Sequence, residues 1–297
     1  MDWEGSREST NVEDLRGQPM AGGGGGVPFG AGGGLGIGTV VIVLVISYFT
    51  GINPSVLLGG AQMVQGARGG YSAPAPSQAR ATAQGGAKDR TTKLVRSVLG
   101  ETEDVWSQIL PQQTGVKYVP ATLVLFSGAT SSGCGTAQSA MGPFYCPEDK
   151  KVYLDTSFFH DMETKYGGGG DFPDAYVVAH EIGHHVQDLL GILGKANDQE
   201  QQVSKTQANA ISVRIELMAD CLAGVFAAHA RNWHVNQSDI QQAIATAQAI
   251  GDDRLQTAAR GYAVPDSFTH GSSAQRVQWL TTGLKSGDVK SCDTFAQ

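Results

Sequence analysis

Apolar residues recur at helical spacing through most of the chain beyond residue 88. The helices are expected at residues 89–110, 177–190, 199–232, 238–259 and 272–284. Gly100 is expected to interrupt the first of them. Two shorter apolar runs, 121–128 and 151–159, predict strands. The pattern therefore predicts an α+β domain that is mainly helical and contains a small β-sheet.

The first 87 residues follow a different pattern, with many small residues and no regular spacing of apolar positions. Residues 1–33 are charged and then glycine-rich, so we expect a disordered tail with little to bury. Residues 59–87 lack apolar periodicity and are expected to form a flexible linker. The folded domain is therefore expected to span residues 88–297.

An apolar stretch, residues 34–58, lies between the tail and the linker. No charged residue occurs between Arg16 and Arg68, so the apolar run can reach the length of a bilayer. A cleaved signal peptide would begin near residue 1, and a buried core helix would not have glycine-rich neighbours. We therefore expect a single transmembrane helix, with a cytosolic N-terminus and the folded domain on the extracytoplasmic side.

The segment VVAHEIGHHVQDLL, residues 177–190, contains the motif HExxH. Each residue of an α-helix advances about 100°, so His180 and His184 lie about 40° apart on one face and can bind one metal ion. Glu181 lies beside them. The motif is short enough to occur by chance. A catalytic zinc site also needs a third protein ligand and one open position.

Two carboxylates, Glu216 and Asp220, lie four residues apart in an otherwise apolar stretch of the helix expected at 199–232. A solvent-exposed stripe would explain such a pair, but Arg214 is the one other charged residue nearby. We therefore expect Glu216 to be the third metal ligand. Asp220 is expected to accept the free ring N–H of a ligating histidine and so to fix its tautomer.

These residue types suit hydrolysis of a peptide bond by a zinc-activated water, with Glu181 as the general base. The longer metzincin motif HExxHxxGxxH is excluded, because Gln187 and Leu190 occupy its later positions. His185 lies about 100° from His184 around the helix and is expected to be a packing or surface residue. The same is expected of His160, His229 and His234. Residues 153–162 are expected to supply an edge strand on which an extended substrate could pair.

The segment THGSSAQR, residues 269–276, offers a further candidate for catalysis. His270 and Arg276 could donate hydrogen bonds to the oxyanion of a tetrahedral intermediate. The alternative is structural, because Ser272 or Ser273 could simply cap the last helix. His270 is therefore retained as a candidate catalytic residue beside this second interpretation.

The four cysteines all lie beyond the apolar stretch. Cys134 and Cys146 flank a loop that contains Gly and Pro, a spacing that suits a local disulfide better than a zinc knuckle. Cys221 and Cys292 could form a second bridge, or Cys221 could be an ordinary buried thiol. Disulfides would require an oxidising compartment, in agreement with an exported domain.

Composition limits the possible partners. The 297 residues carry a net charge of −7, and no run of Lys and Arg interleaved with aromatics occurs. A nucleic-acid partner is therefore not expected. The length allows one domain with extensions rather than two full domains.

Several longer segments resemble one family. HEIGHH, RIELMADCLAG and DSFTHGSSAQR, together with MDWEGSRESTNVEDLRG, GCGTAQSAMGPFYCP and AQAIGDDRLQ, resemble the bacterial neutral zinc metallopeptidases called YpfJ-like proteins. The resemblance covers nearly the whole chain and implies a zincin-like fold. It also implies zinc held by His180 and His184, Glu181 as the catalytic residue, and membrane association. Glu216 follows the ExxxD pattern of glutamate-type zincins, but the 32-residue gap after His184 is longer than in thermolysin-like enzymes.

Two functions from different classes follow from these observations. The first is a zinc metallopeptidase, anchored in the bacterial inner membrane, that acts on peptides or proteins. The alternative is a non-catalytic, zinc-stabilised binding domain displayed from the membrane. The absence of cysteines near HExxH in sequence and the carboxylate of Glu181 favour the enzyme, because structural zinc is usually closed by four protein ligands, often thiolates.

Overall fold

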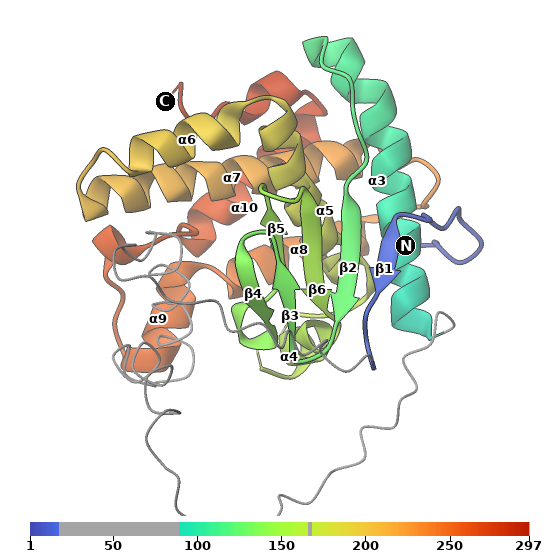
Figure 1. The fold of residues 1–297 in the computed structure, drawn as a ribbon, viewed down its shortest axis with the longest axis horizontal. Coiled ribbons are helices and arrows are strands. Elements are labelled where there is room, and N and C mark those ends of the chain that lie inside the picture. Colours follow the sequence, from blue (N-terminus) through green and yellow to red (C-terminus); the bar gives the residue numbers. More distant parts are fainter. Residues whose placement is uncertain (18–88, 166–167, 297) are drawn as a thin grey trace, which may run out of the picture.

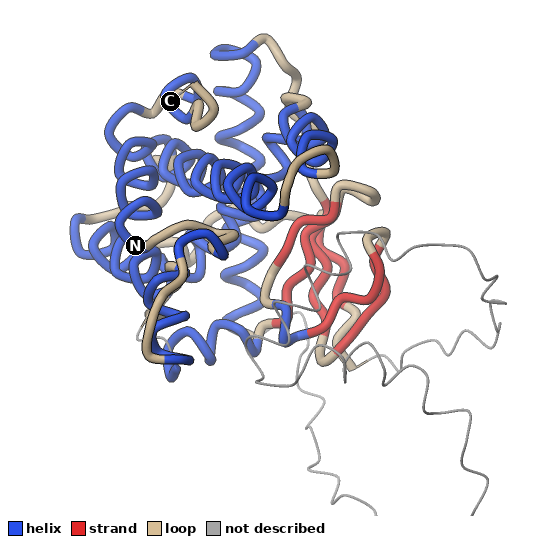
Figure 2. Tube along the Cα trace, turned by 90° about the vertical axis from the view of Figure 1, so that its left-hand side faces the viewer, coloured by secondary structure: helices blue, strands red, loops and turns tan. Residues whose placement is uncertain are grey.

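The computed structural model describes residues 1–17, 89–165 and 168–296. A helical body lies beside a small β-sheet, which occupies one flank of the molecule (Figures 1 and 2). The helices are α3 (Arg90–Thr114), α4 (Ser157–Lys165), α5 (Asp171–Leu189), α6 (Ile192–Glu200), α7 (Lys205–His229), α8 (Gln237–Ala249), α9 (Asp252–Arg260) and α10 (Ser273–Ser286). Short 3₁₀ turns occur at η2 (Ser139–Met141), η3 (Pro265–Ser267) and η4 (Val289–Cys292). The expected mainly helical α+β fold is confirmed for the described residues.

The main sheet has four strands in the order β1-β2-β6-β5. These strands are β1 (Val12–Asp14), β2 (Thr122–Phe126), β6 (Lys151–Asp155) and β5 (Phe144–Cys146). The first three are parallel, and β5 pairs antiparallel with β6. A separate hairpin joins β3 (Ala129–Ser132) to β4 (Gly135–Gln138).

The edge strand differs from the expectation. Because β6 pairs with β2 on one side and β5 on the other, residues 153–162 do not provide an edge. The chain leaves β6 after Asp155 and enters α4 at Ser157, where the Asp155 carboxylate accepts a hydrogen bond from the Ser157 N–H (3.0 Å). The free edge of the sheet on this side is β5.

Residues 1–17 belong to the folded domain, which corrects the expected disordered tail over 1–33. β1 pairs with β2, so the N-terminal segment forms one edge of the main sheet. The indole of Trp3 is buried, and its N–H donates to Asp171 at the start of α5 (2.7 Å). Segment 1–17 has no periodic pattern of its own, and its order comes from docking onto these partners. Residues 18–33 lie outside the described part.

The docked segment also explains why α3 is continuous through Gly100, where an interruption was expected. A Cβ at Gly100 would lie 2.6 Å from the carbonyl oxygen of Arg7. The Arg7 side chain in turn donates to the Gly100 carbonyl oxygen (2.6 Å) and to Glu103 (2.9 Å). Glycine is therefore required for close approach of the N-terminal segment, and the helix continues through it.

The N-terminal segment, residues 1–17, meets the rest of the described chain at the start of α3. Asp89 is the N-cap of α3, and Arg16 lies 3.3 Å from its carboxylate. The Arg16 guanidinium also donates to the Thr92 hydroxyl (2.6 Å). The folded domain therefore includes residues 1–17, which the expected span of 88–297 left out.

The predicted membrane helix, residues 34–58, and the predicted linker, residues 59–87, lie outside the described residues. Among the helices of 1–17, 89–165 and 168–296, none combines the length and the apolar character needed to cross a bilayer.

Two long helices expected from the sequence are each divided. The segment 199–232 contains the end of α6 and all of α7, which begins with a capping box between Ser204 and Gln207. The segment 238–259 coincides with α8 and α9 to within one residue at each end, and the two helices are separated at Gly251. A Cβ at Gly251 would lie 2.6 Å from the Cα of Ser273, so the approach of α10 requires glycine at this break. Periodicity alone did not reveal either break.

Helices α7 and α10 make the most extensive helix–helix contact of the described structure. A Cβ at Gly224 would overlap the carbonyl oxygen of Leu280, and one at Gly283 would overlap that of Cys221. Both disulfides are present: Cys134–Cys146 joins the β3–β4 turn to β5, and Cys221–Cys292 joins α7 to η4. No free cysteine remains among the four. The alternative of Cys221 as a free thiol is therefore excluded.

Candidate metal centre

The site lies where α5 crosses α7. The side of α5 opposite the histidines forms an apolar back, with Val178, Ile182 and Val186 all in the core. At the crossing, a Cβ on Gly183 would lie only 3.0 Å from the Ala219 carbonyl oxygen. Glycine inside HEIGHH thus lets α7 approach closely enough for its acidic side chains to reach the histidines.

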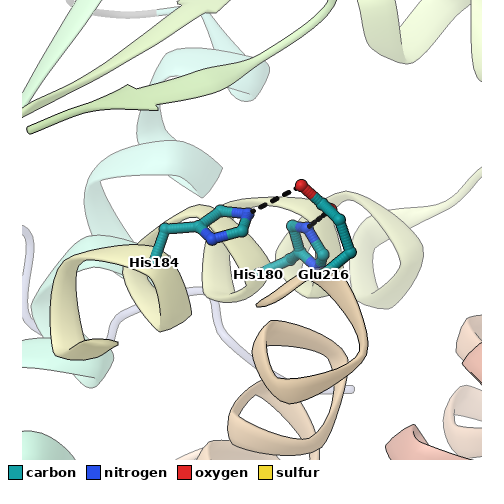
Figure 3. Close-up of side chains that lie close together, drawn as sticks. All are labelled: His180, His184 and Glu216. Atoms are coloured by element: carbon teal, nitrogen blue, oxygen red, sulfur yellow. Dashed lines mark hydrogen bonds and ion pairs between the residues drawn. The ribbon is translucent and has the colours of Figure 1, made fainter. Parts of the chain in front are cut away.

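Three predicted ligands come together at this crossing (Figure 3). His180, His184 and Glu216 each place one ligand atom within 4.8 Å of the other two. The Nε2 atom of His180 lies 3.1 Å from Glu216 Oε2, and that of His184 lies 3.5 Å from Glu216 Oε1. Two imidazoles and one carboxylate are a donor set that zinc binds in catalytic sites.

The electrostatics of the cluster favour a cation. Burial opposes the charged form of His180, but Asp220 and Glu216 outweigh it and raise the pKa of His180 to about 10. Burial likewise opposes ionisation of Glu216, yet His184, His270 and His180 hold the pKa of this carboxyl well below its usual value. The site therefore concentrates negative charge where a metal ion would compete with protons.

Asp220 supports His180 in the predicted manner. The Nδ1–H of His180 donates to Asp220 Oδ1 (2.9 Å), which directs Nε2 towards Glu216. Asp220 is fully buried, with Tyr176 donating to Oδ1 (2.5 Å) and Arg276 donating to both oxygens (2.8 Å each). Arg276 and His180 hold the pKa of Asp220 below its usual value against the effect of burial.

Arg276 is therefore not placed as the expected oxyanion donor. Its guanidinium is buried against Asp220 and also donates to the Tyr176 hydroxyl (3.1 Å). The expected cap is present beside it, because Ser272 and Gln275 form a capping box at the start of α10. The capping box and the buried ion pair together account for residues 272–276, and the sequence did not show which carboxylate Arg276 would meet.

Glu181 lies next to the ligands on α5 and is largely buried. Burial raises the pKa of its carboxyl, while the neighbouring His180 and His184 oppose the shift. A carboxyl with a raised pKa beside a metal cluster can accept a proton and release it again.

His270 lies in the loop after η3, where its charge interacts with that of Glu216. The backbone N–H groups of Thr269, His270 and Gly271 all donate to Asp252 Oδ2, at 2.8, 2.7 and 3.1 Å. Partial burial disfavours the charged ring, but Glu216 and Asp252 raise the pKa of His270. Asp252 was not predicted from the sequence, because its 18-residue separation from His270 carries no periodic signal.

The other histidines have no part in the cluster. His185 is buried, and its Nε2–H donates to the Val119 carbonyl oxygen (2.6 Å), as expected for a packing residue. His229 donates to the Gly287 carbonyl oxygen (2.9 Å). His160 and His234 lie on the surface.

Two residues near the ligands were missed by sequence reasoning. Tyr176 lies one turn before His180 and contacts Asp220, and Gln187 lies one turn after His184 and contacts its ring. The spacings of four and three residues along α5 were the available signal.

Comparison with known proteins identifies the family. The model of a family described as "Putative neutral zinc metallopeptidase" matches residues 1–295. The chain belongs to this family. It is 42% identical to "Uncharacterized protein YpfJ" of Escherichia coli strain K12 over 298 aligned positions, covering 100% of this chain and 99% of the relative. It is 46% identical to "Uncharacterized protein Rv2575" of Mycobacterium tuberculosis over 204 positions, covering 65% of this chain and 66% of the relative. No solved structure matches.

Membership of the neutral zinc metallopeptidase family indicates which metal the cluster would bind. Zinc is implied by the family, and His180, His184 and Glu216 form a group that could hold it. The match includes the N-terminal segment, which the fold places in the same domain as the cluster.

Proposed function

We propose that the protein is a zinc-dependent peptidase in which His180, His184 and Glu216 hold the metal. One observation carries the proposal. The buried carboxyl of Glu181 lies beside the cluster of three ligands but is not one of the ligands. Zinc bound there would polarise a peptide carbonyl and lower the pKa of a water molecule. Three protein ligands in the described residues leave room for that water, whereas structural zinc is usually closed by four.

Glu181 would act as the general base and then as the general acid. Its carboxylate would take a proton from the attacking water and deliver it to the amine that leaves when the C–N bond breaks. The proton balance closes, because the oxygen of the water stays in the new carboxylate and both of its protons pass to the amine, which leaves as an ammonium ion. The raised pKa of Glu181 supports both transfers.

His270 would donate a hydrogen bond to the oxyanion that develops on the carbonyl oxygen. The raised pKa of this histidine keeps a proton available for donation. Asp252 supports the role by fixing the backbone on both sides of His270.

We also propose that the domain works on the extracytoplasmic side of a bacterial cell membrane, in association with it. Two disulfides without a free cysteine support an oxidising compartment. The uncharged stretch between Arg16 and Arg68 supports contact with the bilayer. Peptides or proteins would be the substrates.

The first prediction tests Glu181. In Glu181→Gln, the side chain keeps its size but loses the proton-accepting carboxylate, so peptide hydrolysis should fall by about 10²- to 10⁴-fold. Zinc content should stay at the wild-type value, because Glu181 is not a ligand. The measurement is digestion of a peptide library by the purified full chain, with metal analysis of the same samples.

Glu148→Gln is the matched control, because Glu148 is exposed on the β5–β6 turn. It should leave hydrolysis and zinc content unchanged. Wild-type activity in zinc-loaded Glu181→Gln would refute the mechanism. A wild-type protein that binds zinc but cleaves nothing in the library would favour the non-catalytic binding domain.

A further inference from the structure

Gln187 connects the two helices that carry the ligands. It lies one turn beyond His184 on α5, and its side chain is completely buried. Its Oε1 lies 2.9 Å from His184 Nδ1, and its Nε2–H donates to the Ile215 carbonyl oxygen on α7 (2.7 Å). Ile215 immediately precedes the third ligand, Glu216. One amide therefore contacts one ligand directly and the backbone beside another.

The chemistry of the partners fixes the direction of both hydrogen bonds. A backbone carbonyl can only accept, so the amide nitrogen of Gln187 must face Ile215 and the amide oxygen must face His184. An amide oxygen also only accepts, so Nδ1 of His184 must carry the proton. The lone pair of a neutral His184 is then on Nε2, the atom that faces Glu216.

We infer that Gln187 is a positioning residue that sets the tautomer of His184 and couples its ring to the third ligand. The inference deepens the proposed zinc site and rests on it. Asp220 serves His180 in the same way, but from α7 back to α5. The two residues form reciprocal cross-links between the helices, one from each side of the crossing.

The neutral charge of Gln187 has a physical reason. The cluster already contains three acidic side chains, of which Glu181 and Asp220 are buried and Glu216 is half-buried. Only Asp220 is paired with a buried arginine. A further carboxylate at position 187 would face the Ile215 carbonyl oxygen and add a charge without a partner. An amide orients the histidine without that charge.

The test measures zinc affinity by chelator competition in the full chain. Gln187→Met keeps the approximate volume but removes both hydrogen bonds, so zinc affinity should fall by about 10- to 100-fold. Val186→Ala is the matched control, because Val186 is equally buried but lies on the apolar back of α5. It should lower the melting temperature while leaving zinc affinity within about twofold of wild type.

A second readout follows the proton itself. In zinc-loaded wild type, ¹⁵N NMR should show His184 with a slowly exchanging Nδ1–H, and this signal should be lost in Gln187→Met. If Gln187→Met fails to fold, Gln187→Asn, whose amide is one methylene too short, should weaken zinc binding in the same direction. Wild-type affinity in either folded variant overturns the inference while leaving the zinc site standing. A wild-type chain that binds no zinc overturns the proposed function as well.

Discussion

Asp174 is a half-buried carboxyl in the first turn of α5, about two turns before the metal ligands. Its Oδ1 is buried without a hydrogen-bond partner in the described structure. Burial, with the nearby charges of Asp171 and Glu163, raises the pKa of Asp174 to about 7, and Arg90 opposes the shift only partly. The folded protein therefore binds a proton here that the unfolded chain releases near pH 4.

The second prediction follows from this shift. Because the folded state holds the extra proton, the contribution of Asp174 to stability should fall as pH rises from about 4 to 7 and then stay level. Asp174→Asn cannot ionise, so it should be more stable than wild type at pH 8 by about 1–2 kcal/mol, less than the full shift implies because the carboxyl is partly exposed. The gain should vanish near pH 4, as measured by urea unfolding.

Asp198→Asn provides the control, because Asp198 is exposed on α6. Its effect on stability should be small at both pH values. A gain from Asp174→Asn that is equal at pH 4 and pH 8 would show that ionisation of Asp174 is not its cause.

At the level of single residues, sequence reasoning succeeded where spacing along one helix carried the information. HExxH gave His180, Glu181 and His184, and the four-residue spacing of two carboxylates gave Glu216, all of which the structure brings together. It failed for Arg276, because an arginine on a predicted helix start does not show which distant carboxylate it will meet. Gln187 was read only as the residue that excludes the metzincin motif.

At the scale of the elements, the crossing of α7 and α10 positions the side chains that support the metal cluster. Glu216 and Asp220 lie on α7, and Arg276 lies on α10. Gly283 permits the close approach, since a Cβ there would overlap the Cys221 carbonyl oxygen and lie 2.8 Å from the Val225 nitrogen. The neighbouring atoms are backbone and cannot move aside easily.

The third prediction concerns this crossing. Gly283→Ala should lower the free energy of unfolding by about 2–3 kcal/mol or more, because the added methyl group separates the two helices. It should also weaken zinc retention, since Arg276 would move away from Asp220. Guanidinium unfolding and chelator competition measure the two effects.

Gly194→Ala is the matched control, because Gly194 lies inside α6 with open space at its Cβ position. At this position the same substitution should raise the free energy of unfolding by about 0.5–1 kcal/mol, because alanine has a higher helix propensity than glycine. Equal effects of the two substitutions would mean that α7 and α10 do not pack as described.

The elements themselves were predicted unevenly, for a physical reason. Helix α10 buries one face, with Arg276, Trp279, Leu280 and Gly283, and therefore shows a period in the sequence. Strands β1 and β5 have three residues each, too few to display an alternation. The break at Ser204 depends on a helix cap, and the break at Gly251 depends on the close approach of α10. The spacing of apolar residues reveals neither.

In the whole molecule, the N-terminal segment is the part that sequence reasoning misjudged most. Low apolar content predicted disorder, but the segment is held by contacts with several elements. Arg7 pairs with Glu103 of α3, Trp3 donates to Asp171 of α5, and the amino group of Met1 lies 2.7 Å from Asp239 of α8. Contacts between residues about 100 or more positions apart leave no trace in local composition.

The pairing of β1 with β2 determines on which side of a membrane the N-terminus can lie. A chain that crossed once between residues 17 and 89 would leave β1 in one compartment and β2 in the other. The two strands could not then share a sheet, and Arg16 could not reach Asp89. The expected single crossing with a cytosolic N-terminus would therefore break this pairing. We propose instead that the first residues share the compartment of the metal cluster.

This sidedness gives a last prediction, for which the chain has a clean background because all native cysteines are in disulfides. Glu8→Cys and Lys117→Cys each place a single thiol on an exposed position of one of the two parts. In intact spheroplasts of a bacterial host, a membrane-impermeant maleimide should label both. If position 117 were labelled but position 8 were protected until lysis, the two positions would lie in different compartments. The pairing of β1 with β2 would then be wrong. Labelling of both means that export must carry the first seventeen residues and the metal domain to the same side.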